Sequence, residues 1–271
     1  MKKNKLVFLS ISTITCVILS ILGWTTWLMR PLEIDKLSVI PLNPQMIIAH
    51  AGGTIDGHTY TNSKEALLKS ISEGFQYIEL DLYGTTDGPI VCLHELENFH
   101  EMTGLNIYKF DSKTFKSVNF YNMYTPLTLK EAIEIWETHP FIFVTDKISD
   151  PNILNQYFIH HRDHVMVETP NANYYKRLQK DGYITMLSLD KNINGLIKYV
   201  YSSIINGTLI DRIAIPKATD ISYLRLYKRL GVKVAMFTIN DSTYFNKYFA
   251  GYVNYIYTDS ISPHSFMSEN H

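Results

Sequence analysis

The chain has 271 residues, 46% of them apolar and 13% aromatic, which is enough for one large domain with a substantial core. Its formal net charge of −1 excludes the broad basic field on which nucleic-acid binding usually depends. The two cysteines, Cys16 in an N-terminal apolar run and Cys92 in a predicted core strand, suit neither a disulfide nor a metal site.

The N-terminal segment has the character of a membrane anchor. Residues 6–29 carry no charge, and Lys2, Lys3 and Lys5 precede them. An apolar run of this length crosses a bilayer as one helix, and the leading lysines favour an orientation that leaves the rest of the chain outside the cytoplasm. We therefore predict an anchor over residues 1–29 and a single-pass protein of the cell membrane. A cleaved signal peptide, which would give a secreted protein, and a buried core helix are the alternatives.

Beyond the anchor, a linker is predicted over residues 30–45, one domain over 46–262 and a short tail over 263–271. Apolar strands are predicted at 46–50, 77–82, 90–94, 141–146, 164–168, 184–188, 211–216, 232–238 and 253–258. Amphipathic helices are predicted at 63–73, 128–138, 151–160, 172–180, 193–205, 220–230 and 241–249.

This alternation of strands and helices predicts the fold class. Strands that alternate with helices pair in parallel, with the helices outside the sheet. Eight such units, with one extra strand early in the chain, fit a closed (β/α)₈ TIM barrel. An open nucleotide-binding sheet is disfavoured because Gly52-Gly53 leads into Thr54-Ile55-Asp56-Gly57 rather than into a helix. Residues 96–126 lack periodicity and are predicted to be a long insertion over the C-terminal face of the barrel.

Candidate catalytic residues lie at the ends of the first three predicted strands. Glu79 and Asp81 alternate with apolar neighbours, so their side chains project to the same side of one strand. His50 and His94 end the strands before and after them. Two adjacent carboxylates repel each other unless a cation or a proton lies between them, and two histidines supply one acid and one base. Each of the four residues has a structural alternative, as a buried histidine or as half of an ion pair.

Further polar residues end later strands. Asp146 is the expected third ligand of a hard cation; its alternative role is that of a helix cap, and Asp150 is its competitor. Lys147 and, more weakly, Lys217 are candidate phosphate-binding residues. Glu168 and Asp259 are less specific candidates, Glu168 for a further polar contact and Asp259 for a structural or functional role at the barrel mouth.

These segments resemble the glycerophosphodiester phosphodiesterases, within the phospholipase-C-like barrel superfamily. The family's His-Arg-Gly and Glu-Asn-Thr segments are matched by His50-Ala51-Gly52 and Thr61-Asn62-Ser63. Its Glu-x-Asp, Thr-x-Asp-Gly and Val-x-x-His-Asp segments are matched by Glu79-Leu80-Asp81, Thr86-Asp87-Gly88 and Val91-Cys92-Leu93-His94-Glu95. Weaker echoes are Gly231-Val232-Lys233-Val234, Phe237-Thr238-Ile239-Asn240 and Thr258-Asp259.

The resemblance implies one Ca²⁺ or Mg²⁺ ion bound by Glu79, Asp81 and Asp146, with His50 and His94 as an acid–base pair. It further implies that a substrate hydroxyl next to the phosphate attacks phosphorus and gives a cyclic phosphate. The expected substrate is a glycerophosphodiester or a related lipid or polymer phosphodiester. The alternatives are a non-catalytic barrel that binds a surface polymer and a phospholipase that acts on membrane lipid through an aromatic 96–126 loop.

Three departures from the family pattern are present. Ala51 replaces the arginine, Thr61 replaces the glutamate of Glu-Asn-Thr, and Asp146 adjoins Lys147 where the family's carboxylate precedes its lysine by two positions. The segments His50-Ala51-Gly52-Gly53, Tyr60-Thr61-Asn62-Ser63 and Val144-Thr145-Asp146 resemble a divergent bacterial branch of the family. The three departures bear on the identity of the substrate more than on the type of reaction.

Overall fold

The computed structural model describes residues 44–207, 210–248 and 251–264, with residues 15, 16, 18–20, 22–24, 26, 27 and 30 of the N-terminal segment. Most of the predicted anchor over residues 1–29, most of the linker and most of the tail lie outside these residues. Within the described part of the chain, no helix combines the length and the apolar character that crossing a membrane requires. The anchor therefore stays a prediction from the sequence.

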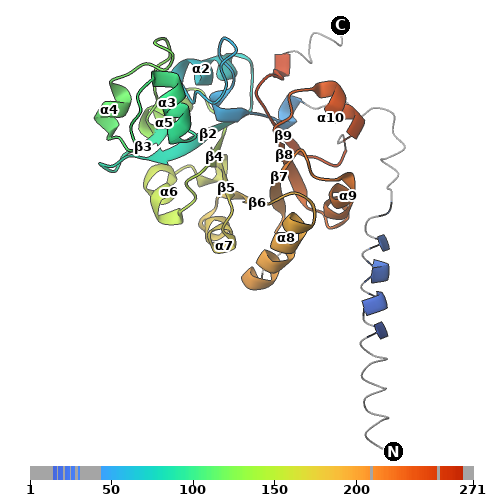
Figure 1. The fold of residues 1–271 in the computed structure, drawn as a ribbon. Helices are drawn as coiled ribbons and strands as arrows, with labels where there is room; N and C mark the ends of the chain where they lie inside the picture. The colour runs from blue at the N-terminus through green and yellow to red at the C-terminus, as the bar shows by residue number, and fades with distance from the viewer. Residues whose placement is uncertain are drawn as a thin grey trace, which may run out of the picture.

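Eight parallel strands close into the predicted barrel (Figure 1). They are β1 (Ile47–Ala49), β2 (Tyr77–Gly84), β4 (Ile142–Asp146), β5 (Val165–Thr169), β6 (Ile184–Ser188), β7 (Arg212–Pro216), β8 (Lys233–Phe237) and β9 (Tyr255–Thr258). Neighbours pair in the order β1-β9-β8-β7-β6-β5-β4-β2, and pairing of β1 with β2 closes the ring. The prediction of a (β/α)₈ barrel is confirmed.

The barrel helices also form where the periodicity predicts them, to within about two residues at each end. They are α2 (Lys64–Ser72), α5 (Leu129–Thr138), α6 (Pro151–Phe158), α7 (Ala172–Asp181), α8 (Asn192–Asn206), α9 (Ile221–Arg229) and α10 (Ser242–Tyr248); short 3₁₀ turns are η2 (Pro44–Met46), η3 (His50–Gly52) and η4 (Arg162–His164). Local signals fix their ends: Thr128 and Glu131 form a capping box on α5, and Gly182 ends α7 in the left-handed region.

Side chains from both faces of the strands form the core. Outward-facing residues pack under the helices in one large cluster. The inward-facing residues form a layer with one member from each of seven strands: Ile48, Val144, Met166, Met186, Ala214, Ala235 and Tyr257. On β2, Glu79 pairs in register with Val144, so a carboxylate stands beside this apolar layer. A charged group at that position is costly unless a ligand or a proton compensates it.

The predicted strand 90–94 differs from the expectation. Strand β3 spans only Ile90–Cys92, lies outside the barrel and runs antiparallel to β2. His94 therefore does not end a barrel strand in the way that His50 does. The turn at residues 85–89 makes a β2–β3 hairpin, and the Leu93 amide donates to the Asp81 carbonyl at 3.0 Å. This bond holds the hairpin against the barrel mouth.

The predicted 96–126 loop is instead a small packed unit with helices α3 (Leu96–Thr103) and α4 (Ser112–Lys116). Tyr108 is 88% exposed, but the other aromatic residues of the unit are buried or half-buried. Four of them, Phe99, Phe110, Phe115 and Phe120, are at most 4% exposed and stack in one cluster against β3. Apolar side chains from segments that are apart in the sequence bury one another and stabilise this unit. Helical periodicity alone does not reveal packing of this kind.

Candidate active site at the barrel mouth

His50 is positioned by a tight turn that follows the first strand. Residues His50–Gly52 form η3, and Ala51, Gly52 and Gly53 all have positive φ angles, of 51°, 80° and 93°. Gly53 must be glycine, because a Cβ atom there would stand 2.1 Å from the Ser70 hydroxyl of α2. The turn aims the Ala51 amide inward, where it donates to Glu79 Oε2 at 2.7 Å.

Asp259, at the end of β9, orients the His50 ring. His50 Nδ1 lies 2.8 Å from Asp259 Oδ1, and Asn240 Nδ2 donates to the other carboxylate oxygen at 2.8 Å. Burial raises the pKa of Asp259, but the hydrogen bonds from His50 and Asn240 outweigh it and hold the pKa below its ordinary value. An ionised carboxylate only accepts, so His50 Nδ1 carries a proton and Nε2 is left for a substrate. The sequence had given Asp259 no more than a general role at the mouth.

Glu79 and Asp81 point into the barrel side by side, as their alternation predicts. Each is 1% exposed. Burial raises the pKa of Glu79 well above its ordinary value, and the charges of Asp81 and Asp146 raise it further. Glu79 Oε1 is buried without a hydrogen-bond partner. Asp81 is held twice by Asn62, which donates to Oδ2 and accepts from the Asp81 amide, both at 3.0 Å.

Asp146 faces the same space from the next strand. It pairs in register with Asp81, and alternation along β4 puts the fully buried Thr145 on the opposite face. Lys147 Nζ lies 3.6 Å from Asp146 Oδ2. The competitor Asp150 is a helix cap, because its Oδ1 accepts from the Asn152 amide at 2.8 Å. The structure therefore gives the two aspartates the distinct positions that the sequence left open.

His94 reaches the mouth from the β2–β3 hairpin. Its Nδ1 lies 3.0 Å from Asn98 Oδ1, one turn further along on α3, and 3.7 Å from Glu95 Oε1. The partner of His94 is thus a neutral amide, where that of His50 is a carboxylate. As on His50, the bond at Nδ1 leaves Nε2 as the nitrogen that can exchange a proton with a substrate.

Tyr60 stands between the two histidines. Its ring centroid lies 4.7 Å from that of His50 and 5.0 Å from that of His94, and it meets both rings edge to face. Its backbone is left-handed, with φ of 59°. Burial raises the pKa of Tyr60, with a further contribution from the charge of Asp259. Aromatic contacts of this kind fix ring positions, so Tyr60 sets how far apart the imidazoles are.

Glu168 is a further carboxylate of the site. It is 6% exposed, accepts from the Ser188 hydroxyl at 2.7 Å and accepts from the Tyr257 hydroxyl at 2.9 Å. Burial, together with the charge of Asp146, raises its pKa to about 7. The Tyr257 ring in turn packs edge to face on His50 at 5.9 Å. Glu168 is therefore part of the wall that supports His50.

These groups surround one cavity of about 210 Å³. Its lining consists of His50, Tyr60, Glu79, His94, Asp146, Lys147, Glu168, Phe237, Thr238 and Tyr257. The structure thus brings together both predicted histidines, two of the three predicted carboxylates and Lys147 in one lining, with Asp81 directly beside it. Lys217 does not line this cavity; it lies exposed at the end of β7, in a neighbouring hollow with Thr238 and Tyr244.

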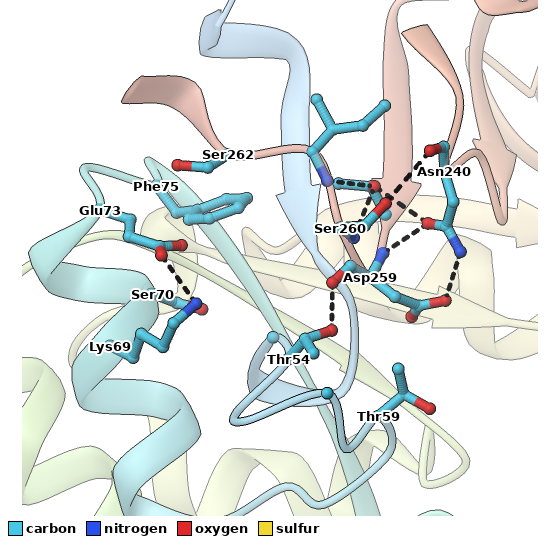
Figure 2. A pocket seen from close by; sticks show the side chains of 14 residues that line it. Thr54, Thr59, Lys69, Ser70, Glu73, Phe75, Asn240, Asp259, Ser260 and Ser262 are labelled. Carbon is cyan, nitrogen blue, oxygen red and sulfur yellow. Dashed lines mark hydrogen bonds and ion pairs between the residues drawn. The ribbon is translucent and has the colours of Figure 1, made fainter. Parts of the chain in front are cut away.

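A second, larger pocket lies on the other side of Asp259 (Figure 2). It has a volume of about 430 Å³ and lies between α2, the 53–59 loop and the end of β9. Its charged side chains include Lys69 and Glu73, which pair with each other at 2.7 Å. Thr54 donates to the Asp259 carbonyl at its edge. No histidine is among its lining residues, so the smaller cavity is the one equipped for proton transfer.

The residues at the mouth suit a hard divalent cation. Glu79, Asp81 and Asp146 supply oxygen ligands, and the unpaired buried oxygen of Glu79 is what a bound cation would satisfy. As they stand, no three Asp, Glu, His or Cys side chains among the described residues form a ready-made metal site. The donor set therefore fits Ca²⁺ or Mg²⁺ by its chemistry, and its side chains must close up to bind either ion.

The roles of several residues of the site were not predicted from the sequence. Asn62 was visible as part of a motif, without its role as the clamp on Asp81. Tyr60 was likewise visible only as part of the segment Tyr60-Thr61-Asn62-Ser63, without a role, and Tyr257 gave no signal, because an aromatic residue near a strand end looks like any other core residue. Asn98 also gave none, although it lies only one helical turn beyond His94.

Comparison with known proteins places the molecule among related ones. The model of the glycerophosphoryl diester phosphodiesterase family matches residues 52–262. Among solved structures, a phosphodiesterase from Oleispira antarctica in complex with the product sn-glycerol-3-phosphate has a TM-score of 0.64 at 18% identity, over 83% of this chain and 97% of its own. The glycerophosphodiester phosphodiesterase of Thermotoga maritima gives 0.61 at 17%, over 83% and 97%. That of Parabacteroides distasonis gives 0.62 at 18%, over 84% and 87%. No curated protein matches the chain.

Proposed function

The chain belongs to the glycerophosphoryl diester phosphodiesterase family and is accordingly a phosphoric diester hydrolase; on that premise we propose that it cleaves glycerophosphodiesters by acid–base catalysis between His50 and His94. The observation that carries the proposal is the shared cavity. Two histidines line it, each oriented through Nδ1, and Glu79 lines it with them and has an unpaired buried oxygen.

The hydrogen-bond partners support different roles for the two histidines. Asp259 stabilises the positive charge that His50 acquires, so His50 is the base: its Nε2 takes the proton of the substrate hydroxyl next to the phosphate. That oxygen bonds to phosphorus while the bond from phosphorus to the other alcohol breaks. His94, without a carboxylate in hydrogen-bond contact, donates its proton to the leaving oxygen. The product of this step is a cyclic phosphate.

Opening of the ring by water reverses the roles. His94 takes a proton from the water, the water oxygen bonds to phosphorus, and His50 returns its proton to the alcohol oxygen that leaves. Both histidines are then in their starting states. Lys147 lines the cavity and would neutralise a phosphate oxygen in both steps.

Glu79, Asp81 and Asp146 are the residues that would hold Ca²⁺ or Mg²⁺. When bound, such an ion supplies positive charge that stabilises the negative charge developing on the phosphate oxygens. Tyr60 and Tyr257 keep the imidazoles in place, and Asn62 keeps Asp81 turned toward the mouth.

The direct test offers glycerophosphocholine to the purified full chain with EDTA, Ca²⁺ or Mg²⁺ and follows the products by ³¹P NMR. We expect a cyclic or simple glycerol phosphate, formed only when a divalent cation is present. Turnover that is equally fast in EDTA would refute the role of the carboxylates. Turnover of Glu79→Gln at the wild-type rate would refute it independently.

The two alternative functions predicted from the sequence lose support for different reasons. Membership of a hydrolase family removes the support for a non-catalytic barrel. A phospholipase with an aromatic interfacial loop loses its main argument, because the phenylalanines of residues 96–126 are buried in their own cluster. Location at the cell membrane, with the barrel outside the cytoplasm, remains a proposal based on the uncharged run 6–29 and the lysines before it.

A further inference from the structure

Helix α8 exposes an apolar stripe that no other barrel helix matches in the described part of the chain. Its members are Ile193, Ile197, Val200, Tyr201 and Ile204, with exposed fractions from 45% to 74%. At about 100° per residue, these five positions fall within an arc of about 100° along the helix. We call them the α8 stripe.

The stripe is not the face that packs on the barrel. Gly195, Tyr199 and Ser202 face the barrel and are buried. At Gly195 a Cβ atom would stand 1.9 Å from the carbonyl oxygen of Asp190, in the segment that leads into the helix. A surface helix normally turns polar residues outward, whereas α8 turns aliphatic ones outward on a side that the fold leaves uncovered.

The surroundings of the stripe are basic. Exposed basic residues precede α8 and flank it on α7 and α9: Lys176, Arg177, Lys180, Lys191 and Lys228. On the other side of the barrel, α3, α5 and the residue before α3 carry exposed acidic residues instead: Glu95, Glu97, Glu101, Glu134 and Glu137 (Figure 1). The exposed charges beside the α8 stripe are therefore mostly basic, with Asp190 and Asp220 as acidic exceptions, whereas those of α3 and α5 are mostly acidic, with Lys130 as the exception.

We propose that the α8 stripe and the lysines beside it dock on a lipid bilayer that contains anionic headgroups. A helix with an apolar stripe and basic flanks lies in the plane of a membrane interface, with its apolar side in the acyl boundary. A symmetric pair of chains would bring the same lysines of α7 and α9 toward each other, so charge disfavours a second copy as the occupant.

The N-terminal segment meets the barrel on this same side. The Arg229 guanidinium of α9 lies 5.4 Å from the centre of the Trp27 ring. The end of the predicted anchor therefore contacts α9, which is the barrel helix that follows α8 and its stripe. Each barrel helix begins near the mouth, because it follows the C-terminal end of a strand, so the stripe runs from the mouth toward the base. Docked in this way, the barrel lies on its side and the catalytic cavity opens along the membrane surface.

The experiment reads the environment of the stripe itself, because the N-terminal segment could hold the chain on vesicles by itself. The full chain carries Cys16→Ser, which removes the exposed thiol and leaves the buried Cys92. Ile197→Cys is labelled with an environment-sensitive fluorophore, and Glu137→Cys on α5 is the matched control. The vesicles are phosphatidylcholine with about 30% phosphatidylglycerol and contain nitroxide-labelled lipid as a quencher.

We expect the label at position 197 to shift to shorter wavelength and to lose about half of its emission or more to the quencher, while the label at 137 does neither. Replacing the phosphatidylglycerol with phosphatidylcholine should weaken both signals. Ile197→Asp with Ile204→Asp should keep wild-type hydrolysis of soluble glycerophosphocholine, and the label, moved to Val200→Cys, should stay in water. A chain that binds vesicles with position 197 unquenched overturns the proposal. So does a lipid-independent shift that grows with protein concentration, which identifies an interface between copies.

Discussion

The two sides of the barrel mouth each present a histidine, but they hold it in different ways. On the barrel side, His50 follows strand β1, and a carboxylate from β9, 209 residues away in sequence, fixes its ring. On the hairpin side, His94 follows β3, and an amide four residues further on, at Asn98, fixes it. The first side is a network between strands, with Asp259, Tyr257 and Glu168 as partners. The second is a local turn packed on the aromatic cluster. The difference is the basis of the proposed roles, in which the base has a charged partner and the acid a neutral one.

Removing either histidine should have the largest effect. We expect His50→Ala and His94→Ala each to lower kcat on glycerophosphocholine by about 10² to 10⁴-fold, because each removes one proton transfer. Circular dichroism and thermal unfolding should show an intact fold. A glycerol diester with p-nitrophenol as its leaving group separates the roles. That group departs without a proton, so His94→Ala should form the cyclic product from it nearly as fast as wild type, whereas His50→Ala should not. The opposite pattern would exchange the roles of acid and base.

Glu168 and Glu79, two carboxylates of the barrel side with raised pKa values, should make the metal-free protein less stable as pH rises. The pKa of Glu168 is raised from 4.5 to about 7 in the folded chain, so the folded state holds this proton more tightly than the unfolded state. Its contribution is complete below pH 4.5 and is lost as pH rises to about 7, a decrease of about 3 kcal/mol in the free energy of unfolding. Glu79, whose pKa is also raised, acts in the same direction.

Chemical denaturation in EDTA at pH 5 and pH 7.5 measures this decrease. Glu168→Gln should remove its own share, and Glu134→Gln, an exposed glutamate on α5, should leave the decrease unchanged. Ca²⁺ should oppose the decrease, because a cation replaces the proton as the partner of the carboxylates. A metal-free protein that becomes more stable over this interval would show that these groups are ionised without cost in the folded state.

Exchanging the partners of the histidines tests the comparison itself. Asp259→Asn should lower kcat by about 10²-fold, because an amide neither balances the imidazolium nor reliably accepts from Nδ1. Asn98→Ala should lower it by only about tenfold, because His94 needs an oriented ring and no charge. Asp163 and His164 form an exposed pair at 3.0 Å elsewhere on the surface, so Asp163→Asn is the matched control. Equal losses for Asp259→Asn and Asn98→Ala would remove the distinction between the two sides.

On the barrel side, the sequence predicted the fold better than it predicted the contacts of the site residues. Alternation of strands and helices is a local signal, and all seven predicted barrel helices are present. The pairing of Glu79 with Asp81 is also local, because alternation on one strand decides it. The bond between His50 and Asp259 depends on closure of the barrel, which brings the first and last strands together, and no local pattern encodes that contact.

On the hairpin side, the predictions from the sequence were incomplete for a different reason. The sequence predicted one extra strand early in the chain but did not identify it as β3, because three buried residues carry no sign of their direction. The phenylalanines of residues 96–126 gave no period, because they converge from two helices and the loops around them rather than from one face. His94 was therefore assigned correctly to the mouth for an incorrect structural reason. The role of Asn98 depends on the orientation of α3, which the sequence did not reveal.

The smallest expected effect separates the two lysines. Lys147 lines the cavity of the two histidines beside Asp146, whereas Lys217 lies in a neighbouring hollow next to Tyr244. Lys147→Ala should raise KM for glycerophosphocholine by about tenfold, because a cation in contact with the phosphate contributes on the order of 1 kcal/mol or more. Lys217→Ala should change KM by less than about twofold, as is usual for an exposed charge outside the contact. A substrate with a second phosphate would reach beyond the cavity. Such a diester could show that Lys217→Ala raises KM as much as Lys147→Ala, although with glycerophosphocholine it does not. That result would mean that the neighbouring hollow is part of the substrate site and that the mouth binds a longer molecule than the smaller cavity holds.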